Sequence, residues 1–172
     1  SQAHLDKVSN YIDIGKSEGA NLVVDGRMHP NMSTGPGFYL GPTLFDNVLP
    51  NMKIYQDEIF GLVLGIVRVK DYQHGVDLIN NHQFGNGTVI FTQNSHVARL
   101  FSMQVKAGMV GINVPLPVPV AYYSFGGVKQ SLFGNSNIYG MEGLQFYTQL
   151  KTISSRWHGS DIVDGPEYSM PS

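Results

Sequence analysis

The stretch that decides the fold is Gln56–Gly61 (QDEIFG), which leads directly into the apolar run Leu62–Val67 (LVLGIV). A short apolar run of this kind predicts a buried strand, so the motif places the carboxylate of Glu58 and the ring of Phe60 at the mouth of that strand. Carboxylate oxygens can accept hydrogen bonds from a vicinal diol such as a ribose, and the aromatic ring can wall the same sugar. Without further context, a Glu in this place is more often a solvated or capping residue.

Downstream of this motif, strand-like and helix-like segments alternate. The pattern predicts a strand at 63–69, a helix at 72–81, a strand at 88–92, a helix from Ser95 that Gly108 stops, and a strand at 109–114. Asp71 and Ser95 are suited to cap the two helices. This order predicts an α/β fold in which parallel strands are joined by right-handed crossover helices. Successive apolar positions such as Val89-Ile90 favour strands that are buried on both faces.

The flanking segments are less regular. Apolar positions at helical spacing predict a helix over about 3–18, with Gly19 as its C′ residue. Short strands are expected at 21–24, 38–40 and 43–45, with a loop at 27–37 and a turn at Asp25-Gly26. Residues 115–137 are rich in Pro and Gly and predict a long loop, which is usually functional. A short helix near 140–147 and an alternating strand at 149–154 complete the chain before a polar tail.

Composition excludes several classes of function. Only 14% of the 172 residues are charged, against roughly 25% in ordinary soluble domains, so we expect part of the surface to be covered by another domain or subunit. The net charge is -2 and no basic run is present, which argues against a nucleic-acid partner. The chain has no run of about 18 apolar residues, so we expect no membrane span. The chain has no Cys, so it supplies no disulfide and no thiol nucleophile.

Other site motifs fail on spacing. Residues 10–17 (NYIDIGKS) nearly match a P-loop but fall inside a predicted helix, and no G-x-G-x-x-G occurs. The six histidines show no ligand spacing, so we expect no metal site. An independent hydrolase would need a nucleophile, yet G-x-S-x-G is absent and His158, Ser160 and Asp161 lie in the polar tail.

Two further segments carry distinctive patterns. Asn113–Pro119 (NVPLPVP) has Pro at alternate positions, which predicts a stiff extended loop after the carboxyl end of a parallel strand. Ligand sites of α/β proteins gather at that edge, although a structural linker would show the same pattern. The segment Ser124–Ser131 (SFGGVKQS) follows, and its paired glycines allow the backbone to turn close to Phe125.

These motifs occur together, and in the same order, in the aldehyde dehydrogenase superfamily. The chain resembles most closely its methylmalonate-semialdehyde dehydrogenase branch, which is NAD-dependent and acylates coenzyme A. The segments Asn80–Thr88 (NNHQFGNGT) and Gly143–Thr152 (GLQFYTQLKT) extend the resemblance over about residues 3–157. It implies the C-terminal portion of an aldehyde dehydrogenase catalytic domain at 1–147, an oligomerisation strand at 148–157 that assembles a homo-oligomer, and a polar tail at 158–172.

The resemblance also implies which residues bind the cofactor. Glu58 would accept hydrogen bonds from the hydroxyls of the nicotinamide ribose, and Phe60 would pack beside that sugar. His4 and Lys7 would contact the adenine ribose, although His4 replaces the more usual Gln or Glu. A solvated helix lysine is the alternative for Lys7. Leu62 replaces the Pro that usually follows the motif, so the turn loses one rigid residue.

The implied substrate pocket comprises Phe125, Pro117 and Ser124, and a plain core position is the alternative for Phe125. The implied reaction converts methylmalonate or malonate semialdehyde to propionyl-CoA or acetyl-CoA with NAD as cofactor. The nucleophilic Cys and the general-base Glu would precede this segment, so no catalytic residue lies in this chain and we expect no activity from it alone. A non-catalytic interaction module of the same fold, or a fragment of another aldehyde dehydrogenase, are the alternatives. The implied location is cytoplasmic in bacteria and the mitochondrial matrix in eukaryotes.

Overall fold

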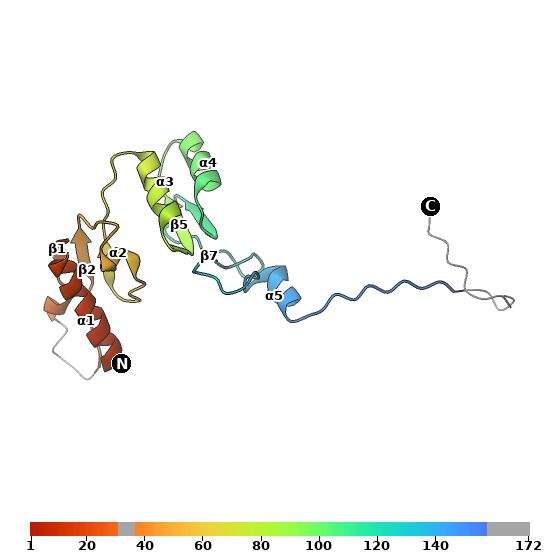
Figure 1. Ribbon diagram of the computed structural model, residues 1–172, viewed down its shortest axis with the longest axis horizontal. Coiled ribbons are helices and arrows are strands. Elements are labelled where there is room, and N and C mark those ends of the chain that lie inside the picture. The colour runs from red at the N-terminus through yellow and green to blue at the C-terminus, as the bar shows by residue number, and fades with distance from the viewer. Residues whose placement is uncertain (31–36, 158–172) are drawn as a thin grey trace.

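The computed structural model describes residues 1–30 and 37–157. In chain order its elements are α1 (Gln2–Ser17), β1 (Asn21–Val24), the 3-10 helix η1 (Gly26–Met28), β2 (Thr43–Asp46), α2 (Lys53–Gln56), β3 (Val63–Gly65), α3 (Tyr72–Asn81), β4 (Phe84–Gly85), β5 (Gly87–Ile90), α4 (Ser95–Gln104), β6 (Met109–Ile112), β7 (Val128–Lys129) and α5 (Gly140–Phe146). In Figure 1, α1, β1, β2 and α2 gather near the N-terminus, α3 and α4 form a second group, and α5 precedes an extended segment.

The N-terminal group is a three-stranded sheet covered by α1. The strand order is β1-β2-β3, with β1 antiparallel and β3 parallel to β2. Ile12 of α1 and Phe45 of β2 are fully buried in one core. A Cβ on Gly15 would lie 2.8 Å from Cζ of Phe45, so this glycine permits the close approach of helix and strand. The helix ends as predicted, because Gly19 adopts a φ of +92° just beyond its last residues.

The second group confirms the α/β fold class. Strands β5 and β6 are parallel, pair Thr88 with Val110, and are joined by the crossover helix α4. The two helices α3 and α4 share a small core of Val76, Phe101 and Val105. The predicted helix at 72–81 is confirmed, and Asp71 caps it by accepting a hydrogen bond from the amide of His74.

The order β3–α3–β5–α4–β6 follows the predicted alternation, but these strands do not lie in one sheet. The hydrogen bonds of β3 go to β2, so the crossover through α3 leads to a separate pair. The strand predicted at 63–69 is also shorter, Val63–Gly65, and is not buried on both faces, since Leu64 is 64% exposed. It is an edge strand of its sheet, and no described element covers its outer face.

Several local predictions are corrected as well. Residues 38–40 form no strand. The chain turns at Asp25-Gly26 as predicted, but residues 27–28 belong to the 3-10 helix η1, which Asp25 caps, and not to a loop. The cap of α4 is Asn94, whose side chain accepts from the amides of His96 and Val97, so Ser95 is the first helical residue instead. That helix ends at Gln104, before Gly108.

The C-terminal part contains little regular structure. Within the loop predicted at 115–137, Val128–Lys129 forms β7, which pairs antiparallel with β4. The helix expected near 140–147 is present as α5. Residues 148–157 form no strand in the single chain, and Leu150 is 99% exposed, because a strand needs a neighbouring ladder to satisfy its backbone. The polar tail at 158–172, with its His158, lies outside the described residues. Within 1–30 and 37–157, no helix is long and apolar enough to cross a membrane.

Candidate functional site

The turn that carries Glu58 and Phe60 lies against one face of α1. The Nε2 atom of His4 donates to the carbonyl oxygen of Phe60 at 2.7 Å, and the hydroxyl of Tyr11 donates to Oδ2 of Asp57 at 3.1 Å. Val8 packs between them on the backbone of Gly61. Residues 4, 8 and 11 recur at helical spacing and therefore share a face, so α1 serves as a support for the turn 57–61.

The conformation of this turn exposes the two predicted ribose-binding side chains. Ile59 is buried in the N-terminal core, whereas Glu58 on one side is exposed and Phe60 on the other is 74% exposed. Phe60 has a φ of +57°, in the left-handed region that side chains rarely adopt. A Cβ on Gly61 would lie 2.6 Å from Cγ2 of Val8, so only glycine fits this close contact. The turn is therefore anchored by the buried Ile59, with the exposed side chains of Glu58 and Phe60 on either side of it.

The carboxylate of Glu58 and the ammonium of Lys7 are both exposed, and neither has a hydrogen bond or ion pair within residues 1–30 and 37–157. An uncommitted carboxylate can accept from two sugar hydroxyls, so the Glu58 carboxylate fits a ribose ligand. A cavity of about 200 Å³ opens beside the turn, and His4, Phe38 and Gly61 are among its lining residues. The structure thus brings His4 into contact with the turn that carries Glu58 and Phe60, and it places Lys7 on α1, the helix that also carries His4.

The predicted substrate residues form a second group around the Pro-rich loop. Pro117 packs on the parallel pair β5–β6, because a Cβ on Gly87 would lie 2.9 Å from its Cγ and one on Gly111 3.3 Å from its Cβ. At the end of β6, the side-chain amide of Asn113 makes two hydrogen bonds to the backbone of Thr92. Its Oδ1 accepts from the Thr92 N–H at 2.8 Å, and its Nδ2 donates to the Thr92 carbonyl oxygen at 2.9 Å. The two glycines therefore let the stiff loop lie directly on the strands.

Ser124 and Phe125 are committed to contacts within the same region. The hydroxyl of Ser124 donates to Oε2 of Glu142 and accepts from Nδ2 of Asn137 at 2.7 Å. The half-buried ring of Phe125 lies 5.3 Å from that of Tyr139, centre to centre. Sequence reasoning missed Glu142 and Asn137, which lie 18 and 13 residues away and belong to no motif. No hydrogen bond, ion pair or ring contact joins this group to the Glu58 turn in the described part of the chain.

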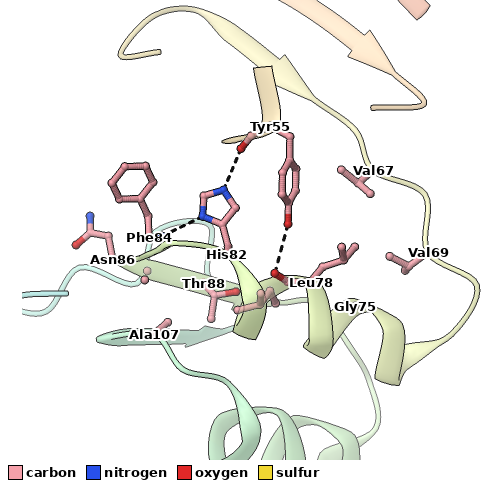
Figure 2. Close-up of a pocket in the computed structure, with 13 residues that line it drawn as sticks. Tyr55, Val67, Val69, Gly75, Leu78, His82, Phe84, Asn86, Thr88 and Ala107 are labelled. Atoms are coloured by element: carbon pink, nitrogen blue, oxygen red, sulfur yellow. Dashed lines mark hydrogen bonds between the residues drawn. The ribbon is translucent and has the colours of Figure 1, made fainter. Parts of the chain in front are cut away.

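A larger hollow of about 430 Å³ lies between α2 and the segment α3–β5, and Figure 2 shows Tyr55 and His82 at its centre. His82 donates from Nε2 to the Tyr55 carbonyl at 2.9 Å and accepts at Nδ1 from the amide of Phe84 at 3.1 Å. These partners require the neutral ring with its proton on Nε2. Burial raises the pKa of the Tyr55 phenol, whose hydroxyl donates to the carbonyl of Leu78. The lining contains no carboxylate, lysine or serine, and its Tyr55 and His82 side chains are already bonded within the chain, so we assign it a structural role.

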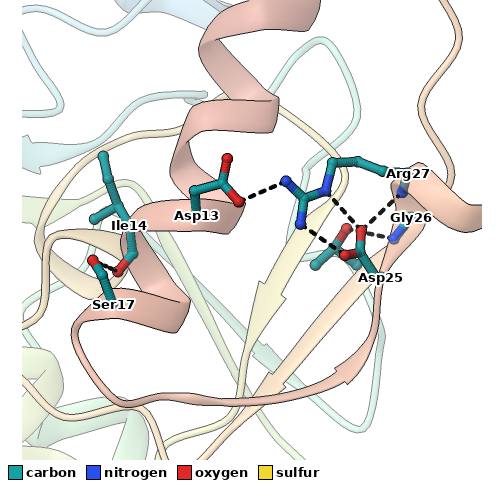
Figure 3. A network of polar contacts seen from close by, with 7 residues as sticks. Asp13, Ile14, Ser17, Asp25, Gly26 and Arg27 are labelled. Atoms are coloured by element: carbon teal, nitrogen blue, oxygen red, sulfur yellow. Dashed lines mark hydrogen bonds and ion pairs between the residues drawn. The ribbon is translucent and has the colours of Figure 1, made fainter.

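A polar network at the start of η1 is also structural. Figure 3 shows the guanidinium of Arg27 between Asp13 of α1 and Asp25, with nitrogen-to-oxygen distances of 2.7 Å to each carboxylate. Its hydrogen bonds hold the pKa of the Asp25 carboxyl below its usual range and raise the pKa of Arg27. This network ties the end of β1 to the middle of α1. In the described ranges, no group of three or more His, Asp or Glu side chains could hold a metal ion.

Comparison with known proteins places this geometry in a family. The chain is 51% identical over 166 residues to a malonate-semialdehyde dehydrogenase of Pseudomonas aeruginosa, covering 96% of this chain and 33% of that protein. A malonate-semialdehyde dehydrogenase of Bacillus cereus is 46% identical over 156 residues, with 91% and 32% covered. This chain therefore spans about a third of the length of these relatives.

Solved structures agree. A methylmalonate-semialdehyde dehydrogenase of Oceanimonas doudoroffii superimposes with a TM-score of 0.89 at 50% identity, covering 93% of this chain and 33% of that one. A putative methylmalonate-semialdehyde dehydrogenase of Sinorhizobium meliloti, complexed with NAD, gives 0.89 at 43% identity, covering 94% and 33%. The model of the aldehyde dehydrogenase family matches residues 1–153, and this chain belongs to that family.

Proposed function

We propose that this chain is part of an NAD-dependent, CoA-acylating enzyme that oxidises methylmalonate or malonate semialdehyde to propionyl-CoA or acetyl-CoA. The observation that supports it most directly is the turn at 57–61, which presents the uncommitted carboxylate of Glu58 beside the exposed ring of Phe60. The similarity to semialdehyde dehydrogenases, one of them complexed with NAD, supports the choice of substrate class and cofactor. NAD would supply the hydride acceptor.

The residues of this chain bind and orient. Glu58 accepts from the hydroxyls of the nicotinamide ribose, Phe60 packs beside that sugar, and Lys7 contacts the adenine ribose. Holding the ribose matters because hydride transfer requires the two reacting carbons at near-attack distance. Pro117, Ser124 and Phe125 shape the substrate tunnel, with the serine acting through the orientation of its loop. No residue here can replace a reactive thiolate, so the isolated chain has no dehydrogenase activity.

Assembly and location complete the proposal. Residues 148–157 pair with the sheet of a neighbouring subunit in a homo-oligomer, which would cover apolar side chains such as Leu150 that stand exposed in the single chain. The bacterial origin of the relatives described above supports the cytoplasm as the location.

The test is Glu58→Gln in a complete enzyme that contains this chain. A hydrogen bond to a charged group contributes roughly 1.5–3 kcal/mol, which corresponds to about a 10- to 150-fold slower hydride transfer. Stopped-flow measurement of NADH formation gives the rate, and a separate acyl-transfer assay with coenzyme A should change less. Asp57→Asn is the matched control, since Asp57 is the neighbouring carboxylate and already bonds Tyr11. Unchanged hydride transfer in Glu58→Gln would return Glu58 to the role of a solvated residue.

A non-catalytic interaction module is the second candidate, favoured by the absence of Cys from the 172 residues. The two candidates differ in the DNA upstream of this segment. An open reading frame with a Cys-containing motif supports the enzyme, and a stop codon directly before Ser1 supports the module.

A further inference from the structure

We propose that His4 is a positioning residue that fixes the turn bearing Glu58 and Phe60, instead of contacting the adenine ribose as the family resemblance implies. The inference rests on the role proposed above for Glu58.

The ring of His4 is already occupied. Its Nε2 atom lies 2.7 Å from the carbonyl oxygen of Phe60, 56 residues along the chain. A carbonyl can only accept, so Nε2 must carry a proton and donate. The ring starts from a fixed point, because the backbone amide of His4 is bonded to the carbonyl of Ser1 at 3.2 Å and the Ser1 side chain caps the helix.

The bond is made to the strained residue itself. A non-glycine residue at a φ of +57° is strained and persists only where its surroundings hold it. Other residues of α1 also support the turn, but Val8 contacts Gly61 and Tyr11 bonds Asp57. Among these side chains, only that of His4 bonds the carbonyl oxygen of Phe60, which belongs to the peptide bond between Phe60 and Gly61. Release of that carbonyl would let the peptide rotate and would move Glu58, two residues earlier.

The ring retains one unused position. With Nε2 donating, a neutral His4 offers a ligand only the lone pair on Nδ1, which could accept from a sugar hydroxyl. The ammonium of Lys7, one turn further along α1, is exposed and without a partner among the described residues. The adenine ribose is therefore assigned to Lys7, and the experiment must separate a direct His4 contact from an effect through the turn.

The first measurement needs no ligand. In the ¹⁵N-labelled full chain, long-range proton–nitrogen NMR should show the Nε2-protonated tautomer at His4. His4→Ala should shift the backbone resonances of residues 58–61, whereas His4→Gln should restore them, since its amide nitrogen reaches as far as Nε2. His4→Asn is the matched control, because its amide reaches only as far as Nδ1 and should behave like Ala. Unmoved resonances in His4→Ala would overturn the proposal.

The second measurement uses two probes on a complete enzyme that contains this chain. ADP carries only the adenine ribose, whereas ADP-ribose carries the second sugar as well. Calorimetry should show ADP-ribose binding weakened about 2- to 10-fold in His4→Ala, the range expected for one hydrogen bond, with ADP binding unchanged and with His4→Gln restored. An equal loss for both probes would establish direct contact with the adenine ribose and refute positioning. A loss for ADP-ribose alone, without a shift of the ligand-free resonances of residues 58–61, would establish direct contact with the second ribose and refute positioning as well. If Glu58→Gln leaves ADP-ribose binding unchanged while the NMR result holds, the ribose clamp fails but His4 still positions the turn.

Discussion

Replacement of Lys129 by Met should loosen the joint between the Pro- and Gly-rich loop and the end of α3. The Nζ atom of Lys129 in β7 donates to the carbonyl oxygens of Ile79 at 2.9 Å and His82 at 3.0 Å. Carbonyls in the last turn of a helix have no partner within the helix, so this lysine from a distant strand satisfies them. The side chain thereby fastens residues 115–137 to α3.

The expected size of the effect follows from the state of the lysine. Burial, and then repulsion from Lys106, lowers the pKa of Lys129, so its environment does not favour the charge itself. We therefore count two ordinary hydrogen bonds of about 0.5–1.5 kcal/mol each, or about 2 kcal/mol in total. Because its pKa is lower in the folded chain than in the unfolded chain, the stability of the wild-type joint should rise as pH increases toward the unfolded lysine value of about 10.4.

Hydrogen exchange at the amides of residues 82–85 measures this joint directly, since local opening sets the exchange rate. A loss of about 2 kcal/mol should speed exchange about 30-fold in Lys129→Met. Lys106→Met makes the same chemical change at an exposed side chain and should leave exchange unchanged or slightly slower, because it removes a like charge. Exchange in Lys129→Met within twofold of wild type would show that water satisfies the two carbonyls equally well.

Three further changes test other parts of the fold. Arg27→Met should lower the free energy of unfolding by about 1 kcal/mol at neutral pH. The folded-state pKa of Asp25 is lowered, so its ion pair stabilises the fold above the ordinary Asp pKa of about 4 and is lost as pH falls. Urea unfolding across pH should therefore show the difference between variant and wild type shrinking below about pH 4. Asn94→Ala should destabilise α4 by about 1 kcal/mol while Ser95→Ala has little effect, and equal losses would restore the serine cap. Thr152→Pro removes a ladder donor and should weaken assembly of the complete enzyme in light scattering without abolishing NAD binding; an intact oligomer would remove the interface.

The elements that the sequence predicts well are those set by local chemistry. The periodicity around Ile12 and the cap at Asp71 specify α1 and α3 nearly to the residue. The cap of α4 was misplaced by one position because Asn94 and Ser95 are both good caps, and only the amide directions distinguish them. The pairing of β3 with β2 was not predicted, for a different reason. Its apolar pattern indicates a strand but carries no information on which neighbour the strand joins.

The candidate site also combines residues that lie in a sequence motif with contacts that leave no signal in the sequence. The prediction for Glu58 and Phe60 rests on a contiguous motif; both side chains are exposed on one turn, and their binding role stays a prediction. The bond from His4 to Phe60 was not foreseeable, since its acceptor is a backbone carbonyl that every residue possesses. The partners of Ser124 were missed because a hydrogen bond to Asn137 leaves no periodic signal in the chain.

The two parts of the proposed function differ in what they require beyond this chain. The turn at 57–61 is anchored in the N-terminal core, because Ile59 packs in one cluster with Ile12 of α1 and Phe45 of β2, and His4 of α1 bonds it at the surface. Its geometry is therefore set by contacts within residues 1–67. The segment 148–157 has no such support among the described residues, and its Leu150 is 99% exposed. Tests of the turn are accordingly meaningful on the chain alone, whereas any test of assembly requires the complete enzyme.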